Sequence, residues 1–125
     1  QARSLARLWG GMGAVYELAI KTASGTLEIV AKRIELPGNC KSVGDKRKKD
    51  SYDVEAAFYA NGHALRLLKA GCTVPYPLHV ENSRGDLTIC MSKLHGRGAR
   101  MDERQSKAVL TWMARLHATY WGPRA

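Results

Sequence analysis

The chain has 125 residues, of which 45% are hydrophobic and 25% are charged, and this is the composition of one folded domain rather than a disordered segment. Lysines and arginines number 20 against 11 acidic residues, so the formal net charge is +9. Such an excess favours an anionic partner, for example a nucleotide, a nucleic acid or a phospholipid surface. No stretch approaches the roughly 20 apolar residues of a bilayer-spanning helix, which excludes a membrane span.

The cysteines and the chain ends bear on location. Cys40, Cys72 and Cys90 are odd in number, far apart and without Cys-x-x-Cys spacing, so neither a disulfide framework nor a zinc site is expected. This usage indicates a reducing, cytoplasmic setting. The sequence opens at Gln1 without an apolar signal core, and we expect both ends to be cut from a longer protein.

The first 36 residues predict three antiparallel strands. Residues 15–21 and 27–36 are rich in Val, Ile and Leu, and the sequence Thr-Ala-Ser-Gly-Thr between them is typical of a hairpin turn. Glycines interrupt the preceding stretch and predict a second hairpin over residues 5–18. Residues 37–50 have no apolar period and contain the basic run 46–49, which we expect to be a solvated loop, with a nucleic-acid or localisation patch as the alternative.

The remaining elements are a long helix, two strands and a further helix. Ser51 can cap the first helix, apolar residues recur at steps of three and four, and Gly71 supplies the stop. Residues 78–81 and 86–91 predict another hairpin, and Asp102 with Gln105 forms a capping-box pattern before an apolar helical stripe. The stripe consists of Val109, Trp112, Met113 and Leu116. The expected fold is α+β, a five-stranded antiparallel sheet packed by one long helix, followed by a connector and a second helix.

Lys32 is the most informative position for function. In a strand over residues 27–36 its side chain shares a face with apolar residues such as Val30 and Ile34. A desolvated ammonium without a counter-charge costs on the order of several kcal/mol, so a carboxylate is expected opposite it. Glu55 is the candidate, because it lies on the helix face expected to approach the sheet. The alternative is that Lys32 extends its ammonium into solvent and that Glu55 is solvated.

The glycine turn is the second candidate element. The segment 10–15, Gly-Gly-Met-Gly-Ala-Val, contains the Gly-x-x-Gly-x-Val part of a phosphate-covering loop, in which backbone amides approach phosphate oxygens. It joins two strands rather than a strand and a helix, which argues against a Rossmann or Walker-type loop. The alternative is that the glycines only form the turn.

The order of these features resembles a known family. The glycine hairpin, Val30-Ala31-Lys32, a helix bearing Glu55 and a later apolar strand resemble the amino-terminal lobe of the protein-kinase-like fold. The segments SYDVEAAFY at 51–59, VPYP at 74–77 and LHATYW at 116–121 are similar to its small-molecule branch of aminoglycoside phosphotransferases, choline kinases and ecdysteroid-kinase-like proteins. The resemblance divides the chain into a kinase-like lobe, 1–94, and a connector with the first helix of a second lobe, 95–125.

The resemblance implies a site that binds ATP. It places nine residues around the nucleotide, namely Gly10, Gly11, Gly13, Val15, Lys32, Glu55, Met91, Lys93 and Leu94. The glycines would cover the phosphates and the valine would roof the adenine. Lys32, oriented by Glu55, would hold the α- and β-phosphates. Met91 lies where the last strand enters the hinge, and the backbone of Lys93 and Leu94 would bind the adenine edge.

The family takes its catalytic base and its Mg²⁺ ligands from an H-x-D-x-x-x-x-N segment and a later Asp in the carboxy-terminal lobe. Neither segment occurs in this sequence. The resemblance therefore implies the nucleotide-binding lobe of an ATP-dependent kinase that phosphorylates a small-molecule hydroxyl, inactive as this fragment. The alternatives are a non-catalytic kinase-like module that binds a partner through the last helix, and a basic nucleic-acid-binding domain, against which the wide separation of Trp9, Trp112 and Trp121 argues.

Overall fold

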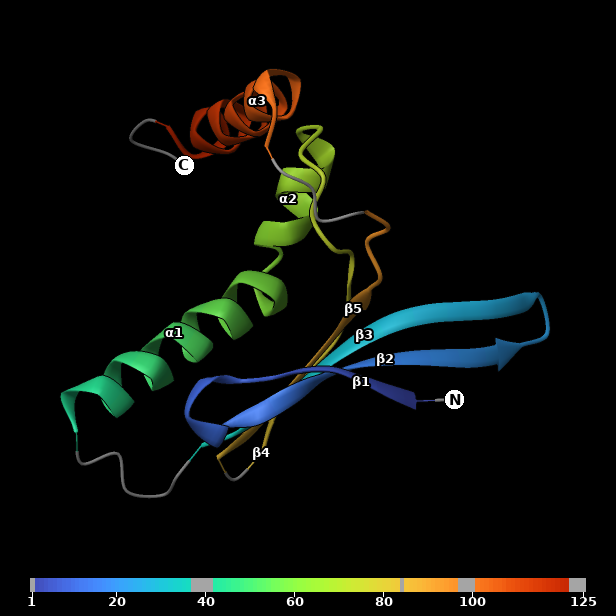
Figure 1. Ribbon diagram of the computed structural model, residues 1–125, viewed down its shortest axis with the longest axis vertical. Coiled ribbons are helices and arrows are strands. Elements are labelled where there is room, and N and C mark those ends of the chain that lie inside the picture. The colour runs from blue at the N-terminus through green and yellow to red at the C-terminus, as the bar shows by residue number, and fades with distance from the viewer. Residues whose placement is uncertain (1, 37–41, 84, 97–100, 122–125) are drawn as a thin grey trace.

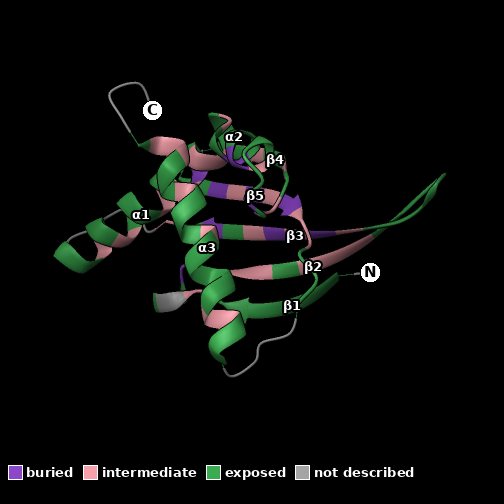
Figure 2. Cartoon of the chain, turned by 90° about the horizontal axis from the view of Figure 1, so that it is seen from above, coloured by how far each residue is buried: buried purple, intermediate pink, exposed green. Residues whose placement is uncertain are grey.

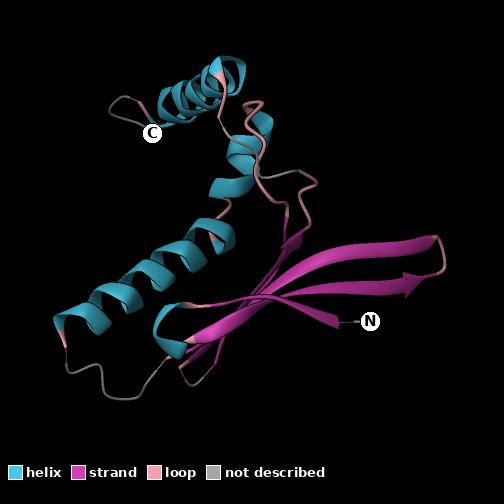
Figure 3. Ribbon diagram, viewed as in Figure 1, coloured by secondary structure: helices cyan, strands magenta, loops and turns pink. Residues whose placement is uncertain are grey.

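The computed structural model describes residues 2–36, 42–83, 85–96 and 101–121. Within these residues the chain forms an α+β fold, a five-stranded antiparallel sheet with three α-helices (Figure 1 and Figure 3). The strands are β1 (Ala2–Arg7), β2 (Gly13–Thr22), β3 (Gly25–Glu35), β4 (Pro77–Ser83) and β5 (Asp86–Ser92). Their order in the sheet is β1-β2-β3-β5-β4, so the predicted five-stranded antiparallel sheet is confirmed.

Two hairpins join the first three strands. A short 3₁₀ turn, η1 (Trp9–Gly11), connects β1 to β2, and the backbone N–H of Leu8 donates to the carbonyl of Gly13 at 2.9 Å. The tighter turn between β2 and β3 begins after Thr22, which pairs with Gly25. This second hairpin projects beyond the rest of the sheet, and its tip is exposed (Figure 2).

The helical region corrects two predictions. Helix α1 (Val43–Ala60) begins well before Ser51, because Ser42 is the N-cap and its hydroxyl accepts the N–H of Asp45 at 3.0 Å. The basic run 46–49 therefore lies within α1 and not in a polar loop. Lysine and arginine are good helix formers, so the run needs no apolar period to be helical.

The single long helix of the prediction is in fact two helices. Gly62 adopts a left-handed conformation, with φ of 80°, and separates α1 from α2 (His63–Lys69). A residue with a Cβ rarely adopts this conformation, and glycine adopts it readily. The chain therefore changes direction at Gly62 rather than continuing straight to Gly71 (Figure 1).

The main core lies between α1 and the central strands. Its buried residues are Ile34, Ala56, Leu87, Ile89 and Met91. Figure 2 shows buried residues gathered on β3 and β5. A second cluster, Ala64, Leu67, Cys72 and Val74, joins α2 to the segment that follows it. Val54, which the three- and four-residue periodicity places among the apolar residues of the predicted long helix, is instead exposed.

Helix α3 (Glu103–Tyr120) begins as predicted. Asp102 accepts the N–H of Gln105 at 2.7 Å, and the Gln105 side chain accepts the N–H of Asp102 at 3.1 Å, which completes the capping box. The helix packs on the second cluster through Trp112, Leu116 and Tyr120. The indole N–H of Trp112 donates to the carbonyl of Thr73 at 2.9 Å.

The structure also bears on the expected absence of a membrane span and on the state of the cysteines. In the described part of the chain, no helix combines the length and the apolar character that crossing a bilayer requires. Cys72 is buried and Cys90 is half-buried, and both are free thiols. Cys40 lies outside the described residues.

Candidate functional site

Lys32 and Glu55 form an ion pair beneath α1. The alternation of β3 places Lys32 on the helix-covered face of the sheet, and its Nζ donates to Oε2 of Glu55 at 2.5 Å. The two side chains are 17% and 31% exposed. The predicted pair is therefore present, and the alternative of a solvated Lys32 is wrong.

Aromatic rings complete the surroundings of this pair. The ring centroid of Tyr52, one turn before Glu55 on α1, lies 5.0 Å from Nζ of Lys32, within the range of a cation–π contact. Burial and, second, the Glu55 carboxylate raise the pKa of Tyr52, and the same two causes raise the pKa of Tyr59. Both phenols stay neutral at physiological pH, so they add no second anion, and Glu55 is the carboxylate paired with Lys32 among the described residues.

The glycine turn has local structural reasons for its composition. Gly10 and Gly11 are exposed and have φ of 72° and 70°, a conformation that favours glycine. Gly13 has φ of 130°, and a Cβ at this position would lie 2.0 Å from the carbonyl oxygen of Arg33. The fold thus requires Gly13 for the close approach of β2 to β3, whatever the turn binds.

The structure places Val15 and Lys32 on adjacent strands, close to the glycine turn. Val15 is directly opposite Lys32 in the β2–β3 pairing, two residues beyond Gly13. The turn itself lies at the end of the sheet that the amino-terminal half of α1 approaches (Figure 1). A ligand held by the turn would therefore be adjacent to the Lys32 ammonium.

The three expected hinge residues have different environments. Met91 is buried in the main core, opposite Val30, whereas Leu94 is exposed. The backbone N–H of Lys93 is directed at the carbonyl of Glu28, at 3.5 Å. Glu28 precedes Lys32 by four residues, about 13 Å of extended strand, so the expected hinge and the glycine turn lie at opposite ends of the Lys32 face.

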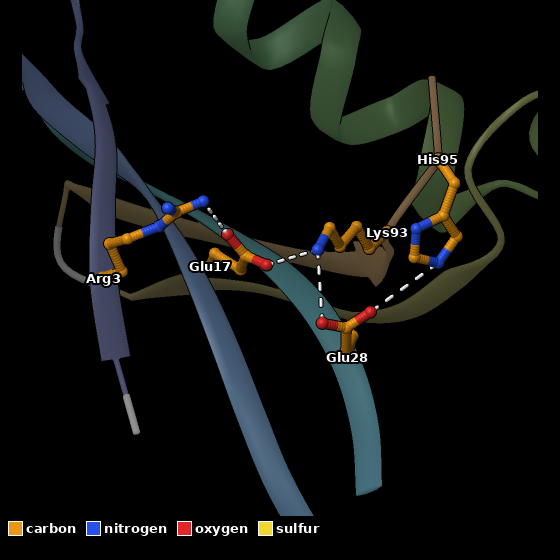
Figure 4. Close-up of polar contacts among 5 residues, drawn as sticks. All are labelled: Arg3, Glu17, Glu28, Lys93 and His95. Carbon is orange, nitrogen blue, oxygen red and sulfur yellow. Dashed lines mark hydrogen bonds and ion pairs between the residues drawn. The ribbon is translucent and has the colours of Figure 1, made fainter. Parts of the chain in front are cut away.

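The sequence interpretation missed a cluster of charges around Lys93 (Figure 4). The Lys93 ammonium contacts the carboxylates of Glu17 on β2 and of Glu28 on β3, the latter at 3.2 Å. Arg3 pairs with Glu17 at 2.6 Å, and Nε2 of His95 lies 3.7 Å from Glu28. Hydrogen bonds from Lys93 and then Arg3 lower the pKa of Glu17, and hydrogen bonds to Glu17 and Glu28 raise the pKa of Lys93.

The register of the β2–β3 hairpin contains the signal for this cluster. Glu17 is opposite Val30, and Glu28 is opposite Ala19, so both carboxylates lie on the Lys32 face. A register counted from the turn after Thr22 would have placed them side by side. The position of Lys93 depends in addition on the pairing of β5 with β3, which is non-local.

In the residues described, no three or more histidine, cysteine or acidic side chains are grouped so that they could hold a metal ion. The site therefore consists of a glycine turn, one half-buried lysine paired with one glutamate, and a charged cluster around Lys93, directly after β5. Comparisons of the chain with protein-family models, with curated proteins and with solved structures find no match.

Proposed function

We propose that this chain is the nucleotide-binding lobe of an ATP-dependent phosphotransferase that acts on a hydroxyl group of a small molecule. The observation that carries the proposal is the pair of Lys32 on the third strand with Glu55 on the following helix, next to a glycine turn. Protein kinases use a lysine and a glutamate on the same elements, together with a glycine-rich loop, to position ATP phosphates.

The charge balance of the pair supports a role beyond stability. A buried ion pair is weak evidence for stabilisation, because desolvation offsets most of the attraction. An ammonium has three donors, and Glu55 is the carboxylate that accepts from Lys32 in the described structure. The remaining donors can bind phosphate oxygens, and Glu55 then orients the ammonium rather than merely neutralising it.

The strand end and connector fit the adenine end of such a ligand. Val15 and Val30 present apolar side chains on the Lys32 face, as a purine ring requires. Because the N–H of Lys93 is directed at β3, we assign the adenine contact to the backbone of Leu94. Met91 supports this region from the core rather than touching the base.

The rest of the chemistry belongs to a second lobe in this proposal. That lobe would supply the base and the Mg²⁺ ligands, and Mg²⁺ would neutralise charge on the phosphates. The chain alone would bind ATP without transferring phosphate. The free thiols of Cys72 and Cys90 fit a cytoplasmic protein.

A second candidate is a non-catalytic module that binds a protein partner. It is favoured by α3, where Val109, Leu110 and Met113 are exposed. In the first proposal this apolar surface packs on the second lobe instead. A nucleic-acid-binding role is less well supported, because Asp45 and Asp50 flank the basic run of α1 and Lys49 pairs with Asp53 at 2.5 Å.

Calorimetry with Mg-ATP tests the proposal. We expect the unmodified chain to bind and Lys32→Ala to bind at least about tenfold more weakly, since a charge-assisted hydrogen bond contributes about 1.5–3 kcal/mol. Lys21→Ala, which removes an exposed lysine on β2, is the matched control and should bind as the unmodified chain does. Equal affinities for the unmodified chain and Lys32→Ala would remove the nucleotide function, and absence of any binding would favour the partner-binding module.

A further inference from the structure

The basic run of α1 contributes one lysine to the glycine turn. Lys48 extends from α1 to the turn, and a Cβ added at Gly10 would lie 3.0 Å from its Nζ. Gly10 thus leaves room for an ammonium against its backbone, in addition to having the left-handed φ of 72°. The contact joins a segment that the sequence interpretation placed in a solvated loop to the element expected to cover phosphates.

Lys48 lies on the same side of α1 as the Lys32 partners. Tyr52 follows it by one helical turn and Glu55 by two, and these two residues contact Lys32. Seven residues separate Lys48 from Glu55, about 10 Å along the helix at 1.5 Å per residue. One ammonium, that of Lys48, therefore lies at the tip of the turn, and the other, that of Lys32, lies nearer its base, where Lys32 is opposite Val15.

The charge of Lys48 is only weakly compensated. Its ion-pair partner in the described residues is Asp45, with Nζ to Oδ1 at 3.7 Å, longer than a charged hydrogen bond. The side chain is 39% exposed, so an anion can reach the ammonium. By contrast, Lys49 in the next position forms a 2.5 Å hydrogen bond with Asp53.

We propose that Lys48 is the second cation of a polyphosphate subsite and binds the outermost phosphate of a nucleoside triphosphate at the tip of the glycine turn. The inference rests on the proposed nucleotide-binding function and adds to it a residue that distinguishes ligands by phosphate number. Lys32 holds the inner phosphates, and Lys48 contributes when the chain of phosphates is long enough to reach Gly10. The selectivity follows from this spacing, since a monophosphate held at Lys32 does not extend to the tip.

Titrations with ATP, AMP and inorganic tripolyphosphate test the subsite. Lys48→Gln should weaken binding of ATP and tripolyphosphate about tenfold and change AMP binding less than twofold, and Lys48→Arg should retain most of the affinity. Lys46→Gln is the matched control, because it removes the same charge from an exposed position of the same helix. Far-UV circular dichroism verifies that each variant keeps its helices.

The outcomes separate this inference from the proposed function. If Lys48→Gln and Lys46→Gln weaken ATP binding equally while Lys32→Ala abolishes it, the Lys48 subsite is wrong and the nucleotide function stands. If ATP binds no better than tripolyphosphate and Lys32→Ala has no effect, but Lys48→Gln still weakens tripolyphosphate binding, the subsite stands and the nucleotide function is wrong. If the unmodified chain does not bind tripolyphosphate, the subsite is overturned directly.

Discussion

Lys32 and Lys93 lie on the same face of one sheet, yet their surroundings differ in charge. Lys32 is covered by a helix and pairs with one carboxylate, whereas Lys93 directly follows β5 and contacts two. The Lys32 ammonium can accept a second anion, and the Lys93 ammonium is already surrounded by negative charge. We interpret the first as a binding group and the second as a tie that holds the connector against β2 and β3.

Of the two ends of this sheet face, we expect the end with the glycine turn to lose more stability on substitution. Gly13→Ala places a methyl group 2.0 Å from the Arg33 carbonyl and should destabilise the chain by about 3 kcal/mol or more, because the clash adds to the backbone strain of a positive φ. Urea unfolding measures the change.

Gly25→Ala provides the matched control for backbone strain. Gly25 has φ of 134° but no atom within 4 Å of an added Cβ, so Gly25→Ala should lower the stability of the chain by only about 1 kcal/mol. Equal losses at the two positions would show that β2 does not approach β3 as closely as described.

Replacing Lys32 and replacing Lys93 should lower the stability of the chain by different amounts and with a different dependence on salt. Lys32→Met leaves the partly covered Glu55 carboxylate unpaired and should cost about 2 kcal/mol, below the 3–5 kcal/mol of a fully buried pair. Lys93→Met should cost less and should do so mainly at low salt, since Lys93 and Glu28 are 26% and 41% exposed, so that salt screens their attraction, and Glu17 keeps Arg3 as a partner. Urea unfolding at 0.15 M and 1 M salt distinguishes them, and a larger loss for Lys93→Met would reverse the interpretation.

The smallest expected effect is a pH dependence at Glu17. Its pKa is lowered in the folded state, so its contribution to stability is present above the unfolded value of about 4.3 and is lost as pH falls through the folded value. For Lys93 the pKa is raised, and its contribution is lost only as pH rises above about 10.4 and through the folded value.

Glu17→Gln should therefore destabilise the chain at pH 7, with a difference that shrinks steadily below about pH 4. Unfolding curves collected from pH 7 to pH 3 measure this difference. In a Lys93→Met background the pH dependence should diminish, because hydrogen bonding from Lys93 is the largest cause of the lowered pKa. An undiminished pH dependence would show that the cluster does not set the charge of Glu17.

Local patterns predict the strands and the Lys32 pair, and their limits explain the errors. Turn residues delimit β2 and β3, and strand alternation suffices to direct Lys32 toward a helix and to select Glu55. The sequence predicts too late a start for α1, because Ser42 and Ser51 are both good caps and nothing local decides between them. The break at Gly62 depends on backbone conformation, which an isolated glycine in a helical pattern does not specify.

Sequence reasoning does not predict the Lys93 cluster or the Lys48 contact, for a different reason. Each joins residues that are far apart in the sequence, with Lys93 meeting Glu17 through the pairing of three strands. Lys48 reaches Gly10 only because α1 begins early enough to include the basic run. Such contacts require the register and the helix boundaries, which are the least certain results of sequence reasoning.

Amide nuclear magnetic resonance during a titration with ATP shows whether the Lys32 face binds the nucleotide, because each backbone N–H reports its own surroundings. We expect the amide signals of Gly10, Gly11, Val15, Lys32 and Leu94 to shift together along one saturating curve, while those at the tip of the β2–β3 hairpin do not move. Shifts confined to that tip or to α3, or no shift at any amide of the Lys32 face, would contradict it.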